Sequence, residues 1–129
     1  MVSLLIVSHS AQLAAGVKEF AEQVAGGKVQ IADAGGAADG SLGTSVDRIQ
    51  ERLRQVASPD GTLVLVDLGS AVLSVEMAIE VLGADRVQIS DAPLVEGAYL
   101  AAIEASVDGA TLEQVAEAAL QARELIKVH

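Results

Sequence analysis

Short apolar runs recur along this chain, and each is followed by a stretch with helical periodicity. The runs Val2–Val7 and Thr62–Val66 are apolar almost throughout and rich in Val, Leu and Ile. A strand that is apolar on both faces is typical of a parallel sheet covered by helices on each side. Shorter runs at Val29–Ala32 and Arg86–Ile89 predict two further strands.

The segments between these strands carry the residues that start and stop helices. Ser10 is suited to cap the first helix, and Gly26-Gly27 to end it. Thr44 or Ser45 is suited to cap the second, and Thr111 with Gln114 forms a capping-box pair before the last. The predicted helices are Ala11–Ala25, a second ending near Val56, a third led in by Asp67-Leu68-Gly69-Ser70 and ending near Leu82, then Leu94–Val107 and Leu112–Lys127.

This order of elements, β-α-β-α-β-α-β-α-α, predicts an α/β fold. The expected architecture is an open, doubly wound parallel sheet with helices on both faces. Right-handed crossovers and the usual small doubly wound arrangement give the strand order 2-1-3-4. With 129 residues and no linker or internal repeat, we expect a single domain over residues 1–129.

Charge and cysteine content exclude several classes of function. The formal net charge of −10 argues against binding to DNA, RNA or an anionic membrane, because phosphate would be repelled. The sequence contains no cysteine, which excludes disulfides and makes the cytoplasm the expected compartment. The N-terminal apolar run is too short to span a membrane and lacks the basic start of a signal peptide.

Two polar side chains follow strands that the predicted topology makes neighbours. His9 comes just after the first strand, and Asp67 ends the third. Ligands of such sheets bind beyond the carboxyl ends of the strands, where successive connections leave in opposite directions. With order 2-1-3-4 this crevice lies between strands 1 and 3, so we expect His9 and Asp67 to meet there. The glycine-rich loop 33–43 can fold over the same edge.

A histidine beside an aspartate at this position suits phosphoryl transfer. Neutral imidazole is a good nucleophile, and a carboxylate that accepts its other N–H fixes the tautomer. The phosphoryl oxygens then need N–H donors, which helix N-termini supply. The candidate catalytic residues are His9 and Asp67, and the candidate phosphoryl-binding residues are Gly43, Thr44, Ser45, Gly69, Ser70 and Ala71. We expect neither a metal nor a cofactor, because no cluster has metal-ligand spacing and the loop fits neither nucleotide motif.

Each of these residues also has a purely structural explanation. Asp67 is suited to cap the turn before the third helix, and the Ser and Thr residues are suited to cap helices. The loop glycines can serve turns alone, and Ser8 can simply finish its strand. His129 ends the chain and receives no role. If Asp67 acts on the histidine, replacing it with alanine should slow phosphorylation and leave the fold intact.

Three segments together resemble a known family. They are Leu-Leu-Ile-Val-Ser-His9-Ser, Gly40-Ser-Leu-Gly-Thr-Ser45 and Leu-Val-Leu-Val-Asp67-Leu-Gly-Ser-Ala71. The chain resembles the phosphotransferase subunits of PTS-dependent dihydroxyacetone kinase, the DhaM family, whose relevant domain is similar to mannose-type EIIA domains. The resemblance covers essentially the whole chain. Mannose-type domains often have Trp-Gly-Gly-Ser-Pro after the aspartate, whereas this chain has Leu68-Gly69-Ser70-Ala71, which favours the dihydroxyacetone branch.

The resemblance implies a route for the phosphoryl group. His9 matches the histidine that HPr phosphorylates, with attack through Nε2, and Asp67 matches the carboxylate beside it. The phosphoryl group then passes to ADP held on the subunit DhaL, which with DhaK phosphorylates dihydroxyacetone. The family also implies a homodimer, for which strand 4 and the third helix (Val72, Val75, Met77 and Ile79) offer apolar residues. Two alternatives remain: a mannose-type sugar EIIA component, and a non-catalytic module regulated by phosphorylation.

Overall fold

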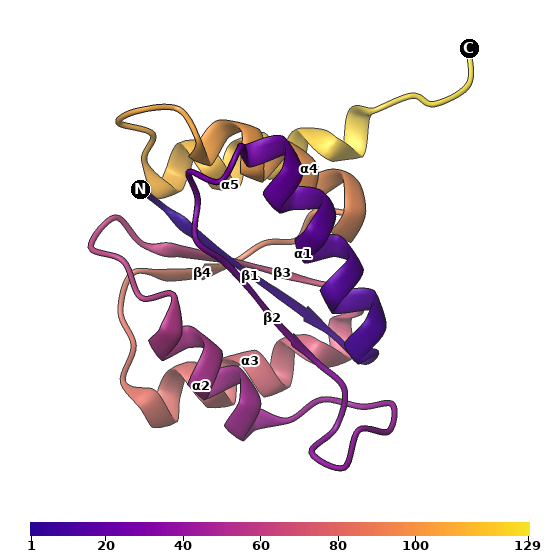
Figure 1. Cartoon of the computed structure of the whole chain (residues 1–129), viewed down its shortest axis with the longest axis vertical. Coiled ribbons are helices and arrows are strands. Elements are labelled where there is room, and N and C mark those ends of the chain that lie inside the picture. Colours follow the sequence, from indigo (N-terminus) through magenta and orange to yellow (C-terminus); the bar gives the residue numbers. More distant parts are fainter.

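A four-stranded parallel sheet forms the centre of the computed structural model, which describes all residues from Met1 to His129 (Figure 1). The strand order is β2-β1-β3-β4, which confirms the predicted order 2-1-3-4. Each neighbouring pair is parallel. The strands are β1 (Ser3–Ser8), β2 (Ile31–Gly35), β3 (Thr62–Val66) and β4 (Val87–Ile89).

Helices cover both faces of the sheet, as the doubly wound prediction requires. In Figure 1, α1, α4 and α5 lie above the sheet, and α2 and α3 lie below it. A short 3-10 helix, η1, continues α5. The helices are α1 (Ala11–Ala25), α2 (Val46–Gln55), α3 (Gly69–Leu82), α4 (Leu94–Ala105), α5 (Leu112–Leu120) and η1 (Gln121–Glu124).

The two faces of the sheet bury cores of different size. The side of α1, α4 and α5 holds a cluster of 20 buried residues, and the side of α2 and α3 holds 11. Alanines dominate the buried face of α4, and they let the helix approach the sheet closely. With only one Phe and one Tyr in the chain, small aliphatic residues supply nearly all of the core. Close packing of small side chains holds the strand ends, and thus the site, in fixed positions.

Some boundaries differ from the sequence predictions. β2 begins at Ile31 and continues to Gly35, three residues beyond the predicted end at Ala32. Gly35 has no side chain, which lets α1 pack closely against this end of the strand. A Cβ added at Gly35 would lie 2.5 Å from the Ser10 carbonyl oxygen. α5 ends at Leu120, seven positions before the predicted Lys127, and only η1 continues it.

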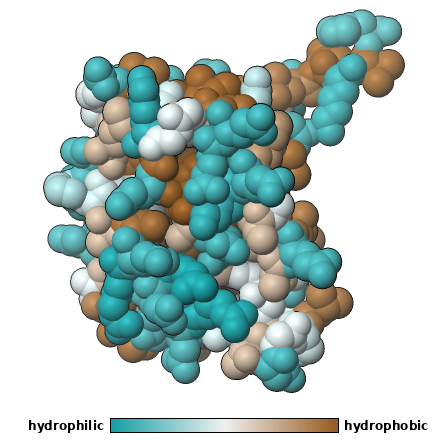
Figure 2. Space-filling view, in the orientation of Figure 1, coloured by the Kyte–Doolittle hydropathy of each residue, from teal (hydrophilic) through white to brown (hydrophobic).

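Hydrophilic residues cover much of the face shown in Figure 2, and the last residues project from the body. No helix is both long and apolar enough to cross a membrane. Of the residues expected at a dimer interface, Val75 is fully buried in the core, so that expectation is wrong for this side chain. Met77 on the same helix is 55% exposed.

Candidate functional site

The register of β1 against β3 places the two predicted catalytic residues beside each other. Val7 pairs with Val66, so Ser8 and His9 continue β1 at the level where Asp67 leaves β3. The Asp67 N–H donates to the Val7 carbonyl at 3.2 Å, which keeps the two strand ends together beyond the last ladder pair. The crevice between strands 1 and 3 therefore brings together residues 58 positions apart in sequence.

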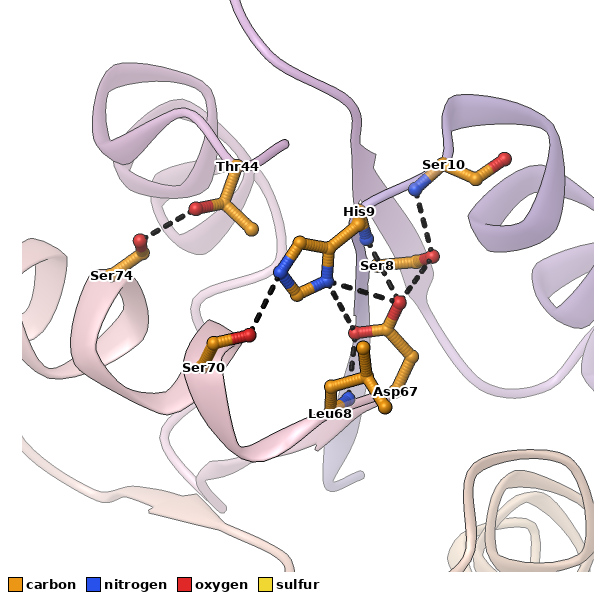
Figure 3. Close-up of polar contacts among 8 residues, drawn as sticks. All are labelled: Ser8, His9, Ser10, Thr44, Asp67, Leu68, Ser70 and Ser74. Carbon is orange, nitrogen blue, oxygen red and sulfur yellow. Dashed lines mark hydrogen bonds and ion pairs between the residues drawn. The ribbon is translucent and has the colours of Figure 1, made fainter. Parts of the chain in front are cut away.

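The Asp67 carboxylate accepts hydrogen bonds from several donors at once (Figure 3). The His9 ring nitrogen Nδ1 lies 3.0 Å from Oδ1 and 3.2 Å from Oδ2. The His9 backbone N–H and the Ser8 hydroxyl each donate to Oδ2 at 2.9 Å, and the Leu68 N–H donates to Oδ1 at 2.7 Å. One carboxylate thus fixes both the ring and the backbone of the histidine.

These donors also determine the charge of the carboxylate. Burial of Asp67 raises the pKa of its carboxyl, but the hydrogen bonds from His9, Ser8 and Leu68 outweigh burial and hold the pKa below its ordinary value. The side chain is only 12% exposed. Asp67 is therefore an ionised acceptor at neutral pH, sheltered from competing water.

An ionised carboxylate decides the tautomer of His9. A carboxylate can only accept, so Nδ1 must carry the proton, and in a neutral ring Nε2 then presents its lone pair. The Ser70 hydroxyl lies 3.0 Å from Nε2 and is the donor of that hydrogen bond. Figure 3 shows Ser70, Ser74 and Thr44 on the Nε2 side of the ring, opposite Asp67. A nucleophilic nitrogen thus faces a group of three hydroxyls.

The N-terminus of α3 lies on this same side. Side-chain hydrogen bonds cap three of the helices: α1 at Ser10, α2 at Ser45 and α5 at Thr111. The N-cap residue of α3 is Leu68, whose apolar side chain cannot form such a hydrogen bond. The Ala71 N–H donates to the Leu68 carbonyl, so it is engaged within the turn. The N–H groups of Gly69 and Ser70 begin a helix without a side-chain cap, where an anion is stabilised.

The glycine-rich loop reaches His9 in a different way from the one predicted. The Gly43 N–H donates to the His9 carbonyl at 2.9 Å, so it positions the histidine and is not free for a phosphoryl oxygen. Ser45 caps α2 through the Arg48 N–H. Thr44 bonds Ser74 of α3, with the two hydroxyl oxygens 2.6 Å apart. Figure 3 shows the Thr44 hydroxyl on the Nε2 side of the ring.

Sequence reasoning missed two residues of this site. Ser8 was explained as the end of a strand, yet its hydroxyl donates to Asp67 and accepts the Ser10 N–H. Ser74 lies one helical turn beyond Ser70 on α3 and has no sequence motif that marks it. Its position at i+4 from Ser70 is the signal that could have found it, because residues four apart share a helix face. The structure contains no group of three His, Cys, Asp or Glu side chains placed to hold a metal.

Comparison with known proteins assigns the family. The EIIA-man family, described as the PTS system fructose IIA component, matches residues 3–117. A DhaM of Listeria innocua, named as the phosphoryl donor subunit of PEP-dependent dihydroxyacetone kinase 2, is 37% identical over the full length of both chains. This chain belongs to the EIIA-man family, and within it to the DhaM subunits. The resemblance seen in the sequence is confirmed.

Other relatives of this EIIA-man chain range from similar to much greater length. The DhaM subunit of Escherichia coli is 42% identical over 96% of this chain, which corresponds to only 27% of that relative. A crystal structure of a protein of unknown function is 39% identical, covers 93% of this chain and 94% of that one, and superposes with a TM-score of 0.80. The DhaM family thus includes both subunits as short as this chain and much longer ones.

Proposed function

We propose that this DhaM chain accepts a phosphoryl group on Nε2 of His9 from HPr and passes it to ADP bound on DhaL, which works with DhaK on dihydroxyacetone. The observation that carries the proposal is the contact of Nδ1 with the Asp67 carboxylate, which leaves Nε2 as the nucleophile. The names of full-length relatives support the substrate and the role as phosphoryl donor. The reaction belongs in the cytoplasm, which the cysteine-free sequence favours.

The proposed step forms one bond and breaks one. The Nε2 lone pair attacks phosphorus in line with the nitrogen of the donor's phosphohistidine, and that P–N bond breaks and returns its electrons to the donor ring. Nδ1 keeps its proton throughout, because the Asp67 carboxylate accepts it and balances the positive charge that develops on the ring. The Ser70 hydroxyl must leave the lone pair before attack.

After phosphoryl transfer, the Ser70 hydroxyl can find a new hydrogen-bond acceptor on the phosphoryl group. Once phosphorus occupies the position in front of Nε2, Ser70 can donate to a phosphoryl oxygen in place of the nitrogen. The uncapped N–H groups of Gly69 and Ser70 provide further donors, and the Thr44 and Ser74 hydroxyls line the same side. The two backbone N–H groups are fixed before the reaction, so they stabilise developing charge without reorganisation. The remaining candidates hold the site in place and do not contact the phosphoryl group: Gly43 bonds the His9 carbonyl, Ser45 caps α2 and Ala71 bonds the Leu68 carbonyl.

The first experiment labels the protein and localises the phosphate. We expect incubation with phosphoenolpyruvate, enzyme I and HPr to add one acid-labile phosphoryl group, measured by intact mass spectrometry. His9→Ala should remain unlabelled, with His129→Ala as the matched control that labels normally, because His129 lies in the exposed C-terminal segment. Labelling of His9→Ala at the wild-type rate would show that another residue is the acceptor.

The second experiment follows the onward transfer. The phosphorylated chain, freed of its donors, is mixed with DhaL carrying ADP, and we expect ATP to form as label leaves His9. A mannose-type sugar component would instead pass its label to a sugar permease component. A phosphorylation-dependent regulatory module would keep its label in the presence of DhaL and ADP. Either result would contradict the proposed acceptor.

A further inference from the structure

The loop that follows β2 holds the backbone of His9 at both of its peptide groups. This 36–43 loop connects β2 to α2 (Figure 1), and three of its residues, Gly36, Gly40 and Gly43, have positive φ angles. The Gly36 N–H donates to the Ser8 carbonyl at 3.1 Å, and the Gly43 N–H donates to the His9 carbonyl at 2.9 Å. These two carbonyls lie on either side of the His9 Cα, so the two ends of the loop help to fix the direction in which the imidazole leaves the backbone.

A loop with this many glycines needs support from outside, because glycine gives the backbone little conformational preference of its own. Arg48 of α2 provides that support. Its Nη1 donates to the Gly35 carbonyl at 2.7 Å, and it lies 3.5 Å from the Gly36 carbonyl oxygen and 3.4 Å from that of Ala37. Hydrogen bonds from a charged donor are stronger than those between neutral groups. One guanidinium thus holds the carbonyls at which the chain leaves β2 and enters the loop.

The place of Arg48 in α2 is unfavourable for the helix itself. The Arg48 backbone N–H donates to the N-cap hydroxyl of Ser45, so this cation lies in the first turn. The positive end of the helix dipole lies at that turn and disfavours a cation there. The other arginines of α2, Arg52 and Arg54, lie in the last turn, where the dipole favours them. Helix stability therefore does not account for Arg48, whereas its contact with the loop does.

Arg52 offers a comparison within the same helix. It follows Arg48 by four residues, so the two side chains share a helix face. The Arg52 Nε donates to the Asp33 carbonyl at 2.9 Å. Asp33 lies inside β2, where it pairs with Ile6 of β1. Both arginines thus donate to backbone carbonyls of β2, but only Arg48 reaches the residues of the loop that holds His9.

We propose that Arg48 is a positioning residue for His9: it fastens the 36–43 loop, whose end N–H groups hold the His9 backbone while Nε2 attacks phosphorus. The proposal rests on the proposed function and adds a residue that acts through the loop, without a hydrogen bond to His9. Nucleophile and phosphorus must be closely aligned, and a displacement of about 1 Å can slow a reaction by roughly a hundredfold. Loss of the Arg48 contacts should therefore slow attack, even with the ring partners Asp67 and Ser70 in place.

The experiment compares the two arginines of this helix face. Arg48→Gln removes the charge and the reach of the guanidinium, and Arg52→Gln is the matched control one turn further along. His9 labelling is followed with phosphoramidate, a small donor that needs no protein contact, and steady-state phosphorylation is followed with phosphorylated HPr. For Arg48→Gln we expect the phosphoramidate rate and kcat to fall about tenfold or more, with KM for HPr changed by less than about twofold. Arg52→Gln leaves the loop fastened and should stay within about twofold of wild type in all three.

Two further measurements separate positioning from a general loss of structure. Urea unfolding gives the free energy of unfolding of each variant, and amide hydrogen exchange reports the Gly43 N–H. We expect Gly43 exchange to be about tenfold faster in Arg48→Gln than in Arg52→Gln, because only the first releases the loop. Arg48→Lys keeps the charge and a donor but lacks the planar fork, so its labelling rate should lie between those of wild type and Arg48→Gln. If Arg48→Gln does not fold, Arg48→Lys against Arg52→Lys gives the same comparison.

Three outcomes would contradict one of the two proposals. Equal slowing by Arg48→Gln and Arg52→Gln would overturn the positioning role, because it would trace the loss to a general loosening of β2. Labelling of Arg48→Gln by phosphoramidate at the wild-type rate would also overturn it, and a rise in KM for HPr alone would then assign Arg48 to donor recognition. Wild type that is labelled by phosphoramidate but not by phosphorylated HPr would refute the proposed donor, while the phosphoramidate comparison would still decide the role of Arg48.

Discussion

The Asp67 carboxylate illustrates how one residue links strand pairing to chemistry. It accepts from the ring and the backbone of His9, from Ser8 and from Leu68, so it closes the end of β1 against β3 while it sets the tautomer. The sequence predicted the ring contact from topology, because neighbouring parallel strands bring their carboxyl ends together. It could not predict the backbone contacts, which depend on the rotamer and register reached after packing.

Replacing Asp67 with asparagine should therefore affect both rate and stability. In Asp67→Asn an NH2 group replaces one of the two carboxylate oxygens, and an NH2 group cannot accept a hydrogen bond. Either the His9 ring N–H or the His9 backbone N–H then faces another donor and loses its acceptor. We expect phosphorylation by HPr to slow by about a hundredfold or more, because the Nδ1–H tautomer loses its fixed acceptor. We also expect about 1–3 kcal/mol less unfolding free energy in urea denaturation. Wild-type rates in Asp67→Asn would remove the carboxylate from the mechanism.

The pH dependence of the same pair gives an independent check. The pKa of Asp67 is lowered in the folded protein, so its contribution to stability is fully present above the ordinary carboxyl pKa and is lost as the pH falls through the lowered value. The stability difference between wild type and Asp67→Asn should shrink as the pH falls below about 4. A difference that grows as the pH falls below about 4 would contradict the lowered pKa.

At the scale of elements, the close approach of β2 to α1 is the feature that the sequence concealed. The segment around Asp33 and Gly35 has the composition of a loop, and the predicted strand stopped at Ala32. Gly35 is needed because the start of α1 leaves no room for a side chain: an added Cβ would lie 2.8 Å from the Ala11 Cα. Periodicity reports which faces are apolar, but it does not report how near two elements come.

Two glycine-to-alanine substitutions test this packing. Gly35→Ala forces backbone atoms apart where α1 begins, just behind His9, and we expect it to destabilise the fold by about 1–3 kcal/mol. Gly16→Ala, on the exposed side of α1 with nothing within 4 Å, should stabilise it by about 0.5–1 kcal/mol. Urea unfolding of both variants gives the comparison. A neutral Gly35→Ala would mean that β2 and α1 lie further apart.

At the scale of the whole molecule, acidic residues far outnumber basic ones. The chain has 18 Asp and Glu residues against 8 Lys and Arg, and several of the cations are already paired or bonded to carbonyls, including Lys18, Arg52 and Lys127. The remaining carboxylates repel one another in the compact state. The family's fold tolerates this excess because its stability comes from the two apolar cores, which charge does not enter.

Salt should therefore stabilise the chain. Raising NaCl from about 0.01 M to 0.15 M shortens the screening length from roughly 30 Å to 8 Å and reduces repulsion among the carboxylates. We expect Tm, measured by circular dichroism, to rise by a few degrees, which corresponds to about 1 kcal/mol. A Tm that does not change with salt would contradict a destabilising repulsion among the carboxylates.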